Sequence, residues 1–391
     1  MSRIRRMTIP AISISLAVLV IASPPPHPAD LSFAETVIRV GKAPGHIAVA
    51  DVNHDGKQDI VVANTQDATI TVLLGDGKGH FSSAAGSPFA CRKNPSDIAV
   101  ADMNGDGTPD LVVANTQTPY ITILLGNGRG EFRPSAHSPF ATSSQPHPHG
   151  VAVGDFVGNG KPAVVTDSWG NRKILLIPSD GRGNLLMPGK SFDADLHSDA
   201  GVLAADFNQD GHLDIVTTTL AENSVGLLLG DGKGGFTRAA GSPFAAAAQS
   251  WSFTVGDINS DGNPDVVVIP YDRDLADASQ LGVAVLLGDG KGRLNKMPGS
   301  PFPLASCKGP ARIATGDVNG DGITDIAVTC AQNDRLMFFL GQPGGTFRTF
   351  SRDVPTGWSG LTIADLRGNG RNEVLVSNYA RGTITILSAN K

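Results

Sequence analysis

The sequence has little charge, few cysteines and few aromatic residues. Of its 391 residues, 17% are charged and 6% are aromatic, and the formal net charge is −6. This composition contains neither the basic footprint of a nucleic-acid-binding protein nor a strongly acidic tail. Nucleic acid is therefore not the expected partner. The catalytic motifs G-x-S-x-G, H-E-x-x-H, C-x-x-C and the P-loop are also absent from the sequence.

Long hydrophobic runs are absent except near the N-terminus. There, an uncharged apolar run, Ile9 to Ala22, follows three arginines and precedes a Pro-rich break. This order predicts a signal peptide over residues 1–22, followed by a Pro-rich linker over residues 23–32. The run has about 14 residues and is short for a membrane span of roughly 20, so we expect no stable membrane insertion after cleavage. The expected location is the periplasm, the cell surface or the medium; an uncleaved anchor is the alternative.

The three cysteines are compatible with export, because disulfides form in oxidising compartments. Cys307 lies just before one expected strand, and Cys330 ends the strand expected to pair with it. A bridge between these two residues is geometrically feasible, and reduced cysteines are the open alternative. Cys91 is then left over and is expected to be a small buried residue.

Glycine and proline, by contrast, are abundant, with 47 and 26 residues, and recur at regular intervals. The intervals follow one acidic segment that occurs seven times, starting at Asp51, Asp102, Asp155, Asp206, Asp257, Asp317 and Asp365. An alternating apolar stretch precedes each copy, and two further apolar runs and a Gly-rich turn follow it. This pattern predicts four short strands in each unit of about 50 residues.

Units of this kind bury both faces only by stacking on their neighbours, and a closed ring leaves no long open edge. We therefore predict an all-β fold, a seven-bladed β-propeller of four-stranded blades over residues 33–391. The residue before each leading Asp is Ala or Gly in all seven copies, as expected where the innermost strands crowd one axis. The last unit ends before its fourth strand, and Phe33 to Val40 resembles a fourth strand. This N-terminal strand is expected to complete the last blade.

Five of the seven acidic segments read D-x-N-x-D-G-x-x-D. In such a loop the oxygens at positions 1, 3, 5 and 9 and the carbonyl at position 7 converge on one point, and hard oxygen ligands select calcium. An Asx-rich turn without metal is the alternative. We expect about five structural Ca²⁺ ions, held by Asp51, Asn53, Asp55, Lys57 and Asp59; Asp102, Asn104, Asp106, Thr108 and Asp110; Asp206, Asn208, Asp210, His212 and Asp214; Asp257, Asn259, Asp261, Asn263 and Asp265; and Asp317, Asn319, Asp321, Ile323 and Asp325.

Two segments depart from this pattern. In the third, Val157 and Ala163 replace the ligands at positions 3 and 9, so no ion is expected there. In the seventh, Arg367 lies between Asp365 and Glu373, and its guanidinium is expected to form a salt bridge with both carboxylates in place of an ion.

The acidic loop, together with the following L-G-D-G-x-G-x-F turn, resembles FG-GAP/VCBS repeats, the units of the integrin α-subunit propeller and of many bacterial secreted proteins. The resemblance covers Phe33 to Lys391. It implies a calcium-stabilised propeller for adhesion or recognition, with its ions on the face opposite the usual ligand face. Members range from adhesion modules to lectins and carbohydrate-processing enzymes, so the function has to be inferred from a site.

The tryptophans and tyrosines all fall in connections on the face opposite the acidic loops. Aromatic rings with polar edges suit stacking on sugars or gripping a peptide. Our first hypothesis is a non-catalytic recognition or adhesion module that binds a glycan or protein ligand there; simple capping of the blades is the alternative. The candidate ligand-binding residues are Tyr120, Trp169, Trp251, Tyr271, Trp358 and Tyr379.

A second hypothesis is a secreted carbohydrate lyase or hydrolase. His147 and His149 enter the third unit, and His197 lies among aspartates entering the fourth, on the same face. Histidines at alternate positions of an extended segment point the same way, so an acid/base or transition-metal site at the channel mouth is conceivable. Solvated polar loops are the alternative.

Overall fold

The computed structural model describes residues 31–142, 148–168, 173–194, 201–219, 223–247, 249–271, 281–357 and 360–390. These residues form strands, turns and irregular segments, and no helix among them is long and apolar enough to cross a membrane. The predicted signal peptide, residues 1–22, and most of the predicted linker, residues 23–32, lie outside the described residues.

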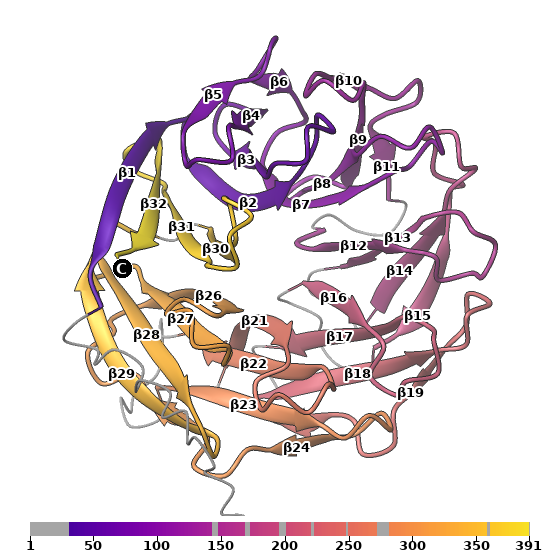
Figure 1. Ribbon diagram of the computed structural model, residues 1–391. Helices are drawn as coiled ribbons and strands as arrows, with labels where there is room; N and C mark the ends of the chain where they lie inside the picture. Colours follow the sequence, from indigo (N-terminus) through magenta and orange to yellow (C-terminus); the bar gives the residue numbers. More distant parts are fainter. Residues whose placement is uncertain are drawn as a thin grey trace, which may run out of the picture.

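Seven antiparallel sheets stand around one axis as the blades of a propeller, as predicted (Figure 1). Blade 1 consists of β2 (Pro44–Ala50), β3 (Asp59–Asn64), β4 (Thr69–Gly75), β5 (Phe81–Ser83) and β6 (Phe89–Ala90). Blade 2 consists of β7 (Pro95–Ala101), β8 (Asp110–Asn115), β9 (Tyr120–Gly126), β10 (Phe132–Pro134) and β11 (Phe140–Ala141). Blade 3 consists of β12 (Val151–Gly154), β13 (Ala163–Asp167), β14 (Lys173–Pro178) and β15 (Lys190–Asp193).

The remaining blades continue around the ring. Blade 4 consists of β16 (Val202–Ala205), β17 (Asp214–Thr219), β18 (Ser224–Gly230), β19 (Phe236–Arg238) and β20 (Phe244–Ala245). Blade 5 consists of β21 (Ser250–Gly256), β22 (Asp265–Pro270), β23 (Gly282–Gly288), β24 (Leu294–Lys296) and β25 (Phe302–Pro303). Blade 6 consists of β26 (Pro310–Gly316), β27 (Asp325–Cys330), β28 (Arg335–Gln342) and β29 (Thr346–Asp353). Blade 7 consists of β30 (Leu361–Ala364), β31 (Glu373–Asn378), β32 (Thr383–Ala389) and β1 (Phe33–Arg39).

The fourth strand of blades 1, 2, 4 and 5 is split into two short pieces that both pair with the third strand. The serine of the S-P-F sequence lies between the pieces and accepts a hydrogen bond from a backbone N–H of that third strand. Ser87 Oγ accepts the N–H of Val72 at 2.9 Å, and Ser300 Oγ accepts that of Val285 at 2.9 Å. The motif therefore anchors the return of the chain along the outer edge of the blade.

The hydrophobic core is divided among the blade junctions. Seven buried clusters are present, and each joins the facing sides of two neighbouring blades, including blades 7 and 1. Between blades 5 and 6, for example, Val267 of β22 packs in one cluster with Ile326 of β27. Because every blade buries apolar side chains on both of its faces, a single blade has no core of its own.

The small residues before the leading aspartates permit close approach of the innermost strands, as predicted. A Cβ atom on Gly154 would lie 2.3 Å from the side chain of Leu213 in blade 4, and one on Gly316 would lie 2.5 Å from Ile363 in blade 7. Both distances are too short for non-bonded carbon atoms, so a larger residue would push neighbouring blades apart.

The ring is closed by the N-terminal strand. β1 pairs antiparallel with β32 over seven residue pairs, from Phe33 opposite Ala389 to Arg39 opposite Thr383. Phe33 also stacks on Phe338 of blade 6 with ring centroids 5.5 Å apart. The predicted completion of the last blade is confirmed, and the edge of β32 is thereby covered.

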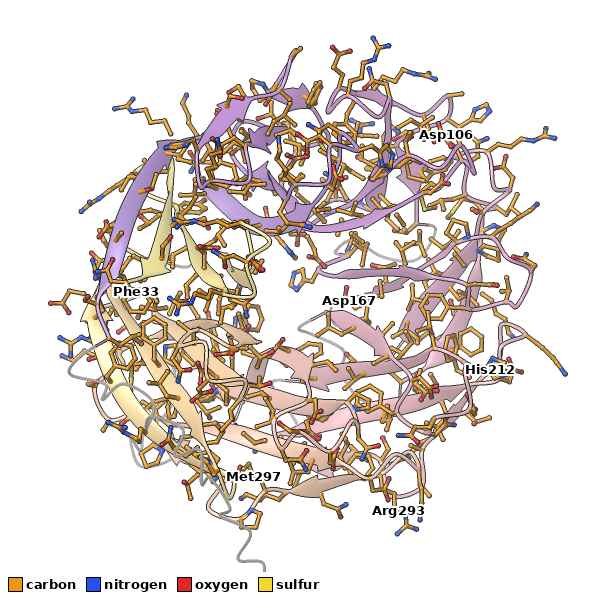
Figure 2. The ribbon with its side chains drawn as sticks, in the orientation of Figure 1. Phe33, Asp106, Asp167, His212, Arg293 and Met297 are labelled. Atoms are coloured by element: carbon orange, nitrogen blue, oxygen red, sulfur yellow. A yellow bond between two sulfur atoms is a disulfide. The ribbon has the colours of Figure 1, made fainter. Side chains whose placement is uncertain are left out.

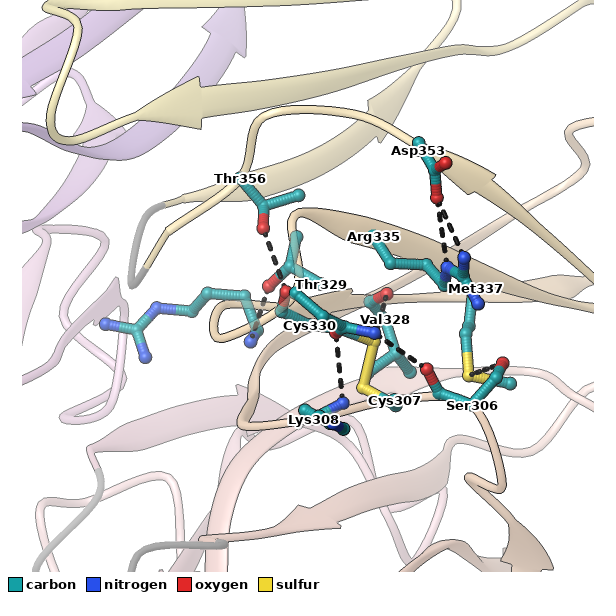
Figure 3. The surroundings of a disulfide bond; sticks show 12 residues. Ser306, Cys307, Lys308, Val328, Thr329, Cys330, Arg335, Met337, Asp353 and Thr356 are labelled. Atoms are coloured by element: carbon teal, nitrogen blue, oxygen red, sulfur yellow. Dashed lines mark hydrogen bonds and ion pairs between the residues drawn. A yellow bond between two sulfur atoms is a disulfide. The ribbon is translucent and has the colours of Figure 1, made fainter.

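A disulfide joins Cys307 to Cys330, which resolves the alternative left open by the sequence (Figure 3). Cys330 ends β27, and its carbonyl accepts a hydrogen bond from Thr356 Oγ1 at 3.2 Å. The bridge therefore holds the segment that enters blade 6 against the second strand of that blade. Cys91 is a free thiol and is half-buried rather than fully buried.

Candidate functional site

A cavity of about 310 Å³ lies on the ring axis, where the first strands of the blades begin. One equivalent position of every blade lines it, five residues before the leading Asp of the repeat. The seven residues at this position are His46, Asp97, Gly150, Gly201, Ser252, Arg312 and Gly360. A strand advances about 3.3 Å per residue, so this position lies roughly 16 Å from the acidic loop that follows the same strand. The cavity is thus at the end of the ring opposite the acidic loops.

Asp97 connects three blades at the wall of this cavity. Its carboxylate pairs with His46 Nδ1 of blade 1 and accepts the N–H of Val151 of blade 3 at 2.9 Å and that of Ile98 at 3.0 Å. Burial alone would raise the pKa of Asp97, but the charge and hydrogen bond of His46 and the backbone N–H groups hold it below its usual value. Asp97 is therefore ionised at neutral pH, and its two oxygens are already engaged.

Arg312 faces the same cavity from β26 of blade 6. Within the described part of the chain, its guanidinium makes one hydrogen bond, from Nη1 to the carbonyl of Ala311 at 3.0 Å, and forms no ion pair. Burial lowers the pKa of Arg312, and the nearby charge of Asp97 opposes this shift. A guanidinium nevertheless stays charged at neutral pH. The cavity wall therefore carries a cation whose remaining N–H donors have no protein acceptor among the described residues.

An aromatic cluster lies at the blade 5 side of the cavity. Trp251, the second residue of β21, lines the cavity. Its ring centroid is 6.4 Å from that of His149 and 5.1 Å from that of Tyr271. These separations are typical of interacting rings. The structure therefore brings together two of the aromatic residues and one of the histidines that the sequence singled out.

Asp167, at the end of β13, is a buried acid at the inner rim of the ring (Figure 2). Its Oδ1 accepts the N–H groups of His149 at 2.8 Å and Gly150 at 2.9 Å, whereas its buried Oδ2 has no hydrogen-bond partner among the described residues. Burial, together with the charge of Asp97, raises the pKa of Asp167 to about 7. Asp167 thus holds the backbone at the cavity wall and exchanges a proton near neutral pH.

The acidic loops at the other end of the ring share one hydrogen-bond pattern. In blade 1, Asp51 Oδ2 accepts the N–H of Gly56 at 2.8 Å and Oδ1 accepts that of Asp55 at 3.2 Å. The other four complete loops repeat both bonds. The leading carboxylate therefore lies inside its loop, with the backbone wrapped around it.

The aspartate at position 9 has a structural role that the sequence did not reveal. Asp265, for example, is fully buried; its Oδ2 accepts the N–H of Ile258 at 2.8 Å, and its Oδ1 accepts that of Gly288 at 2.8 Å. The same two bonds occur in the other four complete loops. This carboxylate clamps the start of the acidic loop to the end of the third strand of its blade.

The two divergent loops behave differently. The loop of blade 3 keeps the turn, since Asp155 Oδ2 accepts the N–H of Gly160 at 2.7 Å, although Val157 and Ala163 replace two ligands. In blade 7 the predicted ion pair is present: Arg367 Nε lies 3.2 Å from Glu373 Oε1. The predicted salt bridge to Asp365 is absent among the described residues, because the guanidinium of Arg367 turns to Glu373 and to the hydroxyl of Ser388. Asp365 accepts a hydrogen bond from the backbone N–H of Arg367 instead, at 3.2 Å.

The donor set of the five complete loops fits a hard divalent cation. All of its donors are oxygens. Burial, together with the charges of Asp106 and Asp102, raises the pKa of Asp110 to about 6. Such crowding of like charges is what a bound cation relieves. Among the described residues, no three acidic, histidine or cysteine side chains converge as a metal site, so the calcium ligands stay a prediction.

The repeat that forms these loops has a recognised family model. The FG-GAP-like repeat matches residues 51–113, 103–166, 206–268 and 317–376, which together make up more than half of the chain. The chain belongs to the FG-GAP-like repeat family. Each matched range begins at or next to the leading Asp of one blade and extends into the second strand of the next blade. The FG-GAP repeat is therefore offset from the blade, so that each repeat crosses one of the buried junctions.

No curated protein is significantly similar to this FG-GAP propeller in sequence. Solved structures resemble it in fold. A lectin of Agrocybe aegerita that recognises non-reducing terminal N-acetylglucosamine is 19% identical, with a TM-score of 0.54 over 89% of this chain and 86% of that chain. Virginiamycin B lyase from Staphylococcus aureus, in a catalytically inactive form with quinupristin, is 11% identical, with a TM-score of 0.56 over 91% and 99%. The periplasmic gluconolactonase of Pseudomonas aeruginosa is 16% identical, with a TM-score of 0.56 over 81% and 86%.

The four described aromatic candidates of the FG-GAP propeller do not all line the axial cavity. Trp251 lines the axial cavity and Tyr271 packs against it, whereas Tyr120 and Tyr379 do not line it. The guanidinium of Arg92 lies 4.5 Å above the Tyr120 ring, and the Tyr379 hydroxyl accepts a hydrogen bond from Gln66 at 3.4 Å. Two further candidates, Trp169 and Trp358, lie outside the described residues.

The histidine hypothesis is met only in part by the described residues. His149 lies beside the cavity, whereas His147 and His197 lie outside the described residues. Sequence reasoning missed His46, Asp97 and Arg312, which belong to no motif. Comparison of the seven repeats column by column, five residues before each leading Asp, would have found all three. Asp167 was also missed; it occupies a strand position where the other blades have Ala, Thr, Ile or Ser.

Proposed function

We propose that this FG-GAP propeller is an exported, non-catalytic recognition module that binds a glycan or protein ligand in its axial cavity. The observation that carries this proposal is the cavity itself, which has one lining position from every blade and Trp251 beside polar and charged side chains. Its volume, about 310 Å³, is at the lower end of the usual range for ligand pockets. Because each lining position is held by a strand packed on both sides, the site is preorganised.

The test is a binding screen with a matched pair of variants. A glycan array and a pull-down are probed with the whole protein, with Trp251→Ala and with Tyr379→Ala. Tyr379 is 40% exposed and lies away from the cavity, so its loss controls for removal of a surface aromatic residue. We expect Trp251→Ala to lose the ligand and Tyr379→Ala to keep it. Equal binding by both variants would count against the axial site.

We further propose that the five complete acidic loops hold structural Ca²⁺ through positions 1, 3, 5, 7 and 9. The ions would balance three carboxylates per loop, which repel one another without metal. Chelation should therefore lower the melting temperature, and returned calcium should restore it, with magnesium as the control cation. A melting temperature indifferent to chelator would refute a structural role for calcium.

A second candidate function is a carbohydrate lyase or hydrolase. The observation that favours it is the presence of titratable groups at the cavity: the His46–Asp97 pair lines it, and the buried Asp167 holds the backbone of two lining residues, His149 and Gly150. Polysaccharides bound on the array should then be depolymerised by the whole protein. Ligand capture without the appearance of reducing ends or unsaturated products supports the recognition module.

Export is proposed from the N-terminal sequence. Expression of the full chain in a bacterial host should yield a periplasmic or extracellular protein shortened by about 22 residues, as predicted from the signal pattern. Mass spectrometry of the mature N-terminus checks this directly. An uncleaved chain in the membrane fraction would favour the anchor instead.

A further inference from the structure

The charges around the axial cavity are unequally satisfied. On the negative side, the carboxylate of Asp97 is engaged by His46 and by two backbone N–H groups. On the positive side, Arg312 has only the carbonyl of Ala311 as a hydrogen-bond acceptor among the described residues. A charge removed from water is costly unless it is paired. The cavity is therefore equipped to receive an anionic group at Arg312.

The neighbours of Arg312 limit the kind of anion. The guanidinium offers planar, forked donors that match a carboxylate. Trp251 lines the same cavity from β21, the first strand of the adjacent blade, and Ser252 lies next to it on that strand. The strands β21 and β26 approach closely, since a Cβ atom on Gly256 would lie 2.9 Å from Thr315 Oγ1. A cation, an indole ring and a hydroxyl are thus offered together by two neighbouring strands.

This combination suits a sugar ring that carries a carboxylate. The indole gives a flat surface for the apolar face of the ring, the serine hydroxyl can exchange hydrogen bonds with sugar hydroxyls, and the guanidinium takes the acidic group. The cavity volume of about 310 Å³ admits one terminal residue more readily than a long chain. An acidic peptide could pair a carboxylate with Arg312, but it would gain less from contact with the indole of Trp251.

Resting on the recognition function proposed above, we propose that the axial cavity binds a terminal uronic acid residue, with its carboxylate on Arg312 and its ring against Trp251. The position that supplies Arg312 is Gly in blades 3, 4 and 7 and Ser in blade 5, so these four blades leave the centre of the cavity to the ligand.

The test compares two ligands that differ only in the acid group. Methyl β-D-glucuronide and methyl β-D-glucoside are titrated calorimetrically into the full protein with calcium present. The variants are Arg312→Gln, Arg312→Lys and Trp251→Ala. The control is Arg335→Gln, which removes an arginine of the same blade that pairs with Asp353 at 3.0 Å on the surface. Circular dichroism and melting temperature verify that each variant is folded.

We expect the wild-type protein to bind the glucuronide about 10- to 100-fold more tightly than the glucoside, as expected for one charge-assisted hydrogen-bonded pair. Arg312→Gln should remove this preference, Arg312→Lys should retain part of it, and Arg335→Gln should leave it intact. Trp251→Ala should weaken both ligands. If both glycosides bind equally and only Trp251→Ala weakens them, the recognition function stands and the acid preference is wrong. If the wild-type protein does not bind the glucuronide, the inference is overturned, and the glycan array then decides the recognition function separately.

Discussion

The position-9 aspartates should stabilise the propeller even when no metal is bound. Replacement of Asp265 by Ala removes both acceptors of its clamp and leaves the N–H groups of Ile258 and Gly288 without partners. These N–H groups belong to the acidic loop and to the end of β23, so the substitution removes a link between these two parts of blade 5. A residue whose only task was to bind calcium would have no such effect in the absence of the ion.

The magnitude follows from two opposing terms. Each hydrogen bond to an ionised acceptor stabilises a fold by about 1.5–3 kcal/mol. Part of this is offset because the carboxylate is buried: burial, together with the charges of Asp261 and Asp257, raises the pKa of Asp265 to about 6. We therefore expect Asp265→Ala to lower the free energy of unfolding by roughly 2 kcal/mol, a typical loss for a broken buried network.

The assay is urea unfolding at neutral pH in excess chelator, with Asp261→Ala as the matched control. Asp261 is an expected calcium ligand of the same loop, but it is exposed and accepts only local bonds, such as the N–H of Asn263 at 2.8 Å. In chelator we expect Asp261→Ala to stay within about 0.5 kcal/mol of the wild-type protein. With calcium, both variants should show weaker stabilisation by the ion. Equal stability of the two variants in chelator would refute the clamp.

Three further perturbations follow from the structure. Asp167 has a folded-state pKa raised from 3.8 to about 7, so its protonated form favours the folded state below pH 4, and this contribution is lost as the pH rises through about 7. The free energy of unfolding of Asp167→Asn should therefore be close to that of the wild-type protein at pH 4, differ more at pH 5, and exceed it by up to about 4 kcal/mol at pH 8. A difference independent of pH would contradict this. Arg367→Met leaves the Glu373 carboxylate, which is 5% exposed, without its cation, and should lower the free energy of unfolding by about 1–3 kcal/mol. Adding Glu373→Gln to the same chain should restore the lost stability. If the double variant shows no recovery, loss of the ion pair does not cause the destabilisation. Deletion of residues 33–39 uncovers the edge of β32 and should give concentration-dependent association in light scattering, whereas a monomeric, equally stable protein would show that closure does not depend on β1.

The repeat determined most of the fold. Its period, the apolar runs in each unit and the small residue before each leading Asp predicted seven blades, because a unit with two apolar faces has to stack. The missing fourth strand of the last unit predicted the pairing of β1 with β32, and the structure confirms it. The ion pair of Arg367 with Glu373 was also predictable, since both residues belong to one short loop.

The axial site was decided only in three dimensions. His46, Asp97 and Arg312 lie far apart in the sequence and in three different blades, and they meet because ring closure brings the starts of all first strands to one axis. Since the seven blades carry different residues at this position, no repeated motif marks it. The clamp of Asp265 was hidden for a similar reason: Gly288, one of its two partners, belongs to the third strand, 23 residues away. Local patterns determined which strands and loops form, because strand propensity and turn chemistry act over a few neighbouring residues. The closed ring alone decided which side chains face one another, because those contacts depend on how the blades pack.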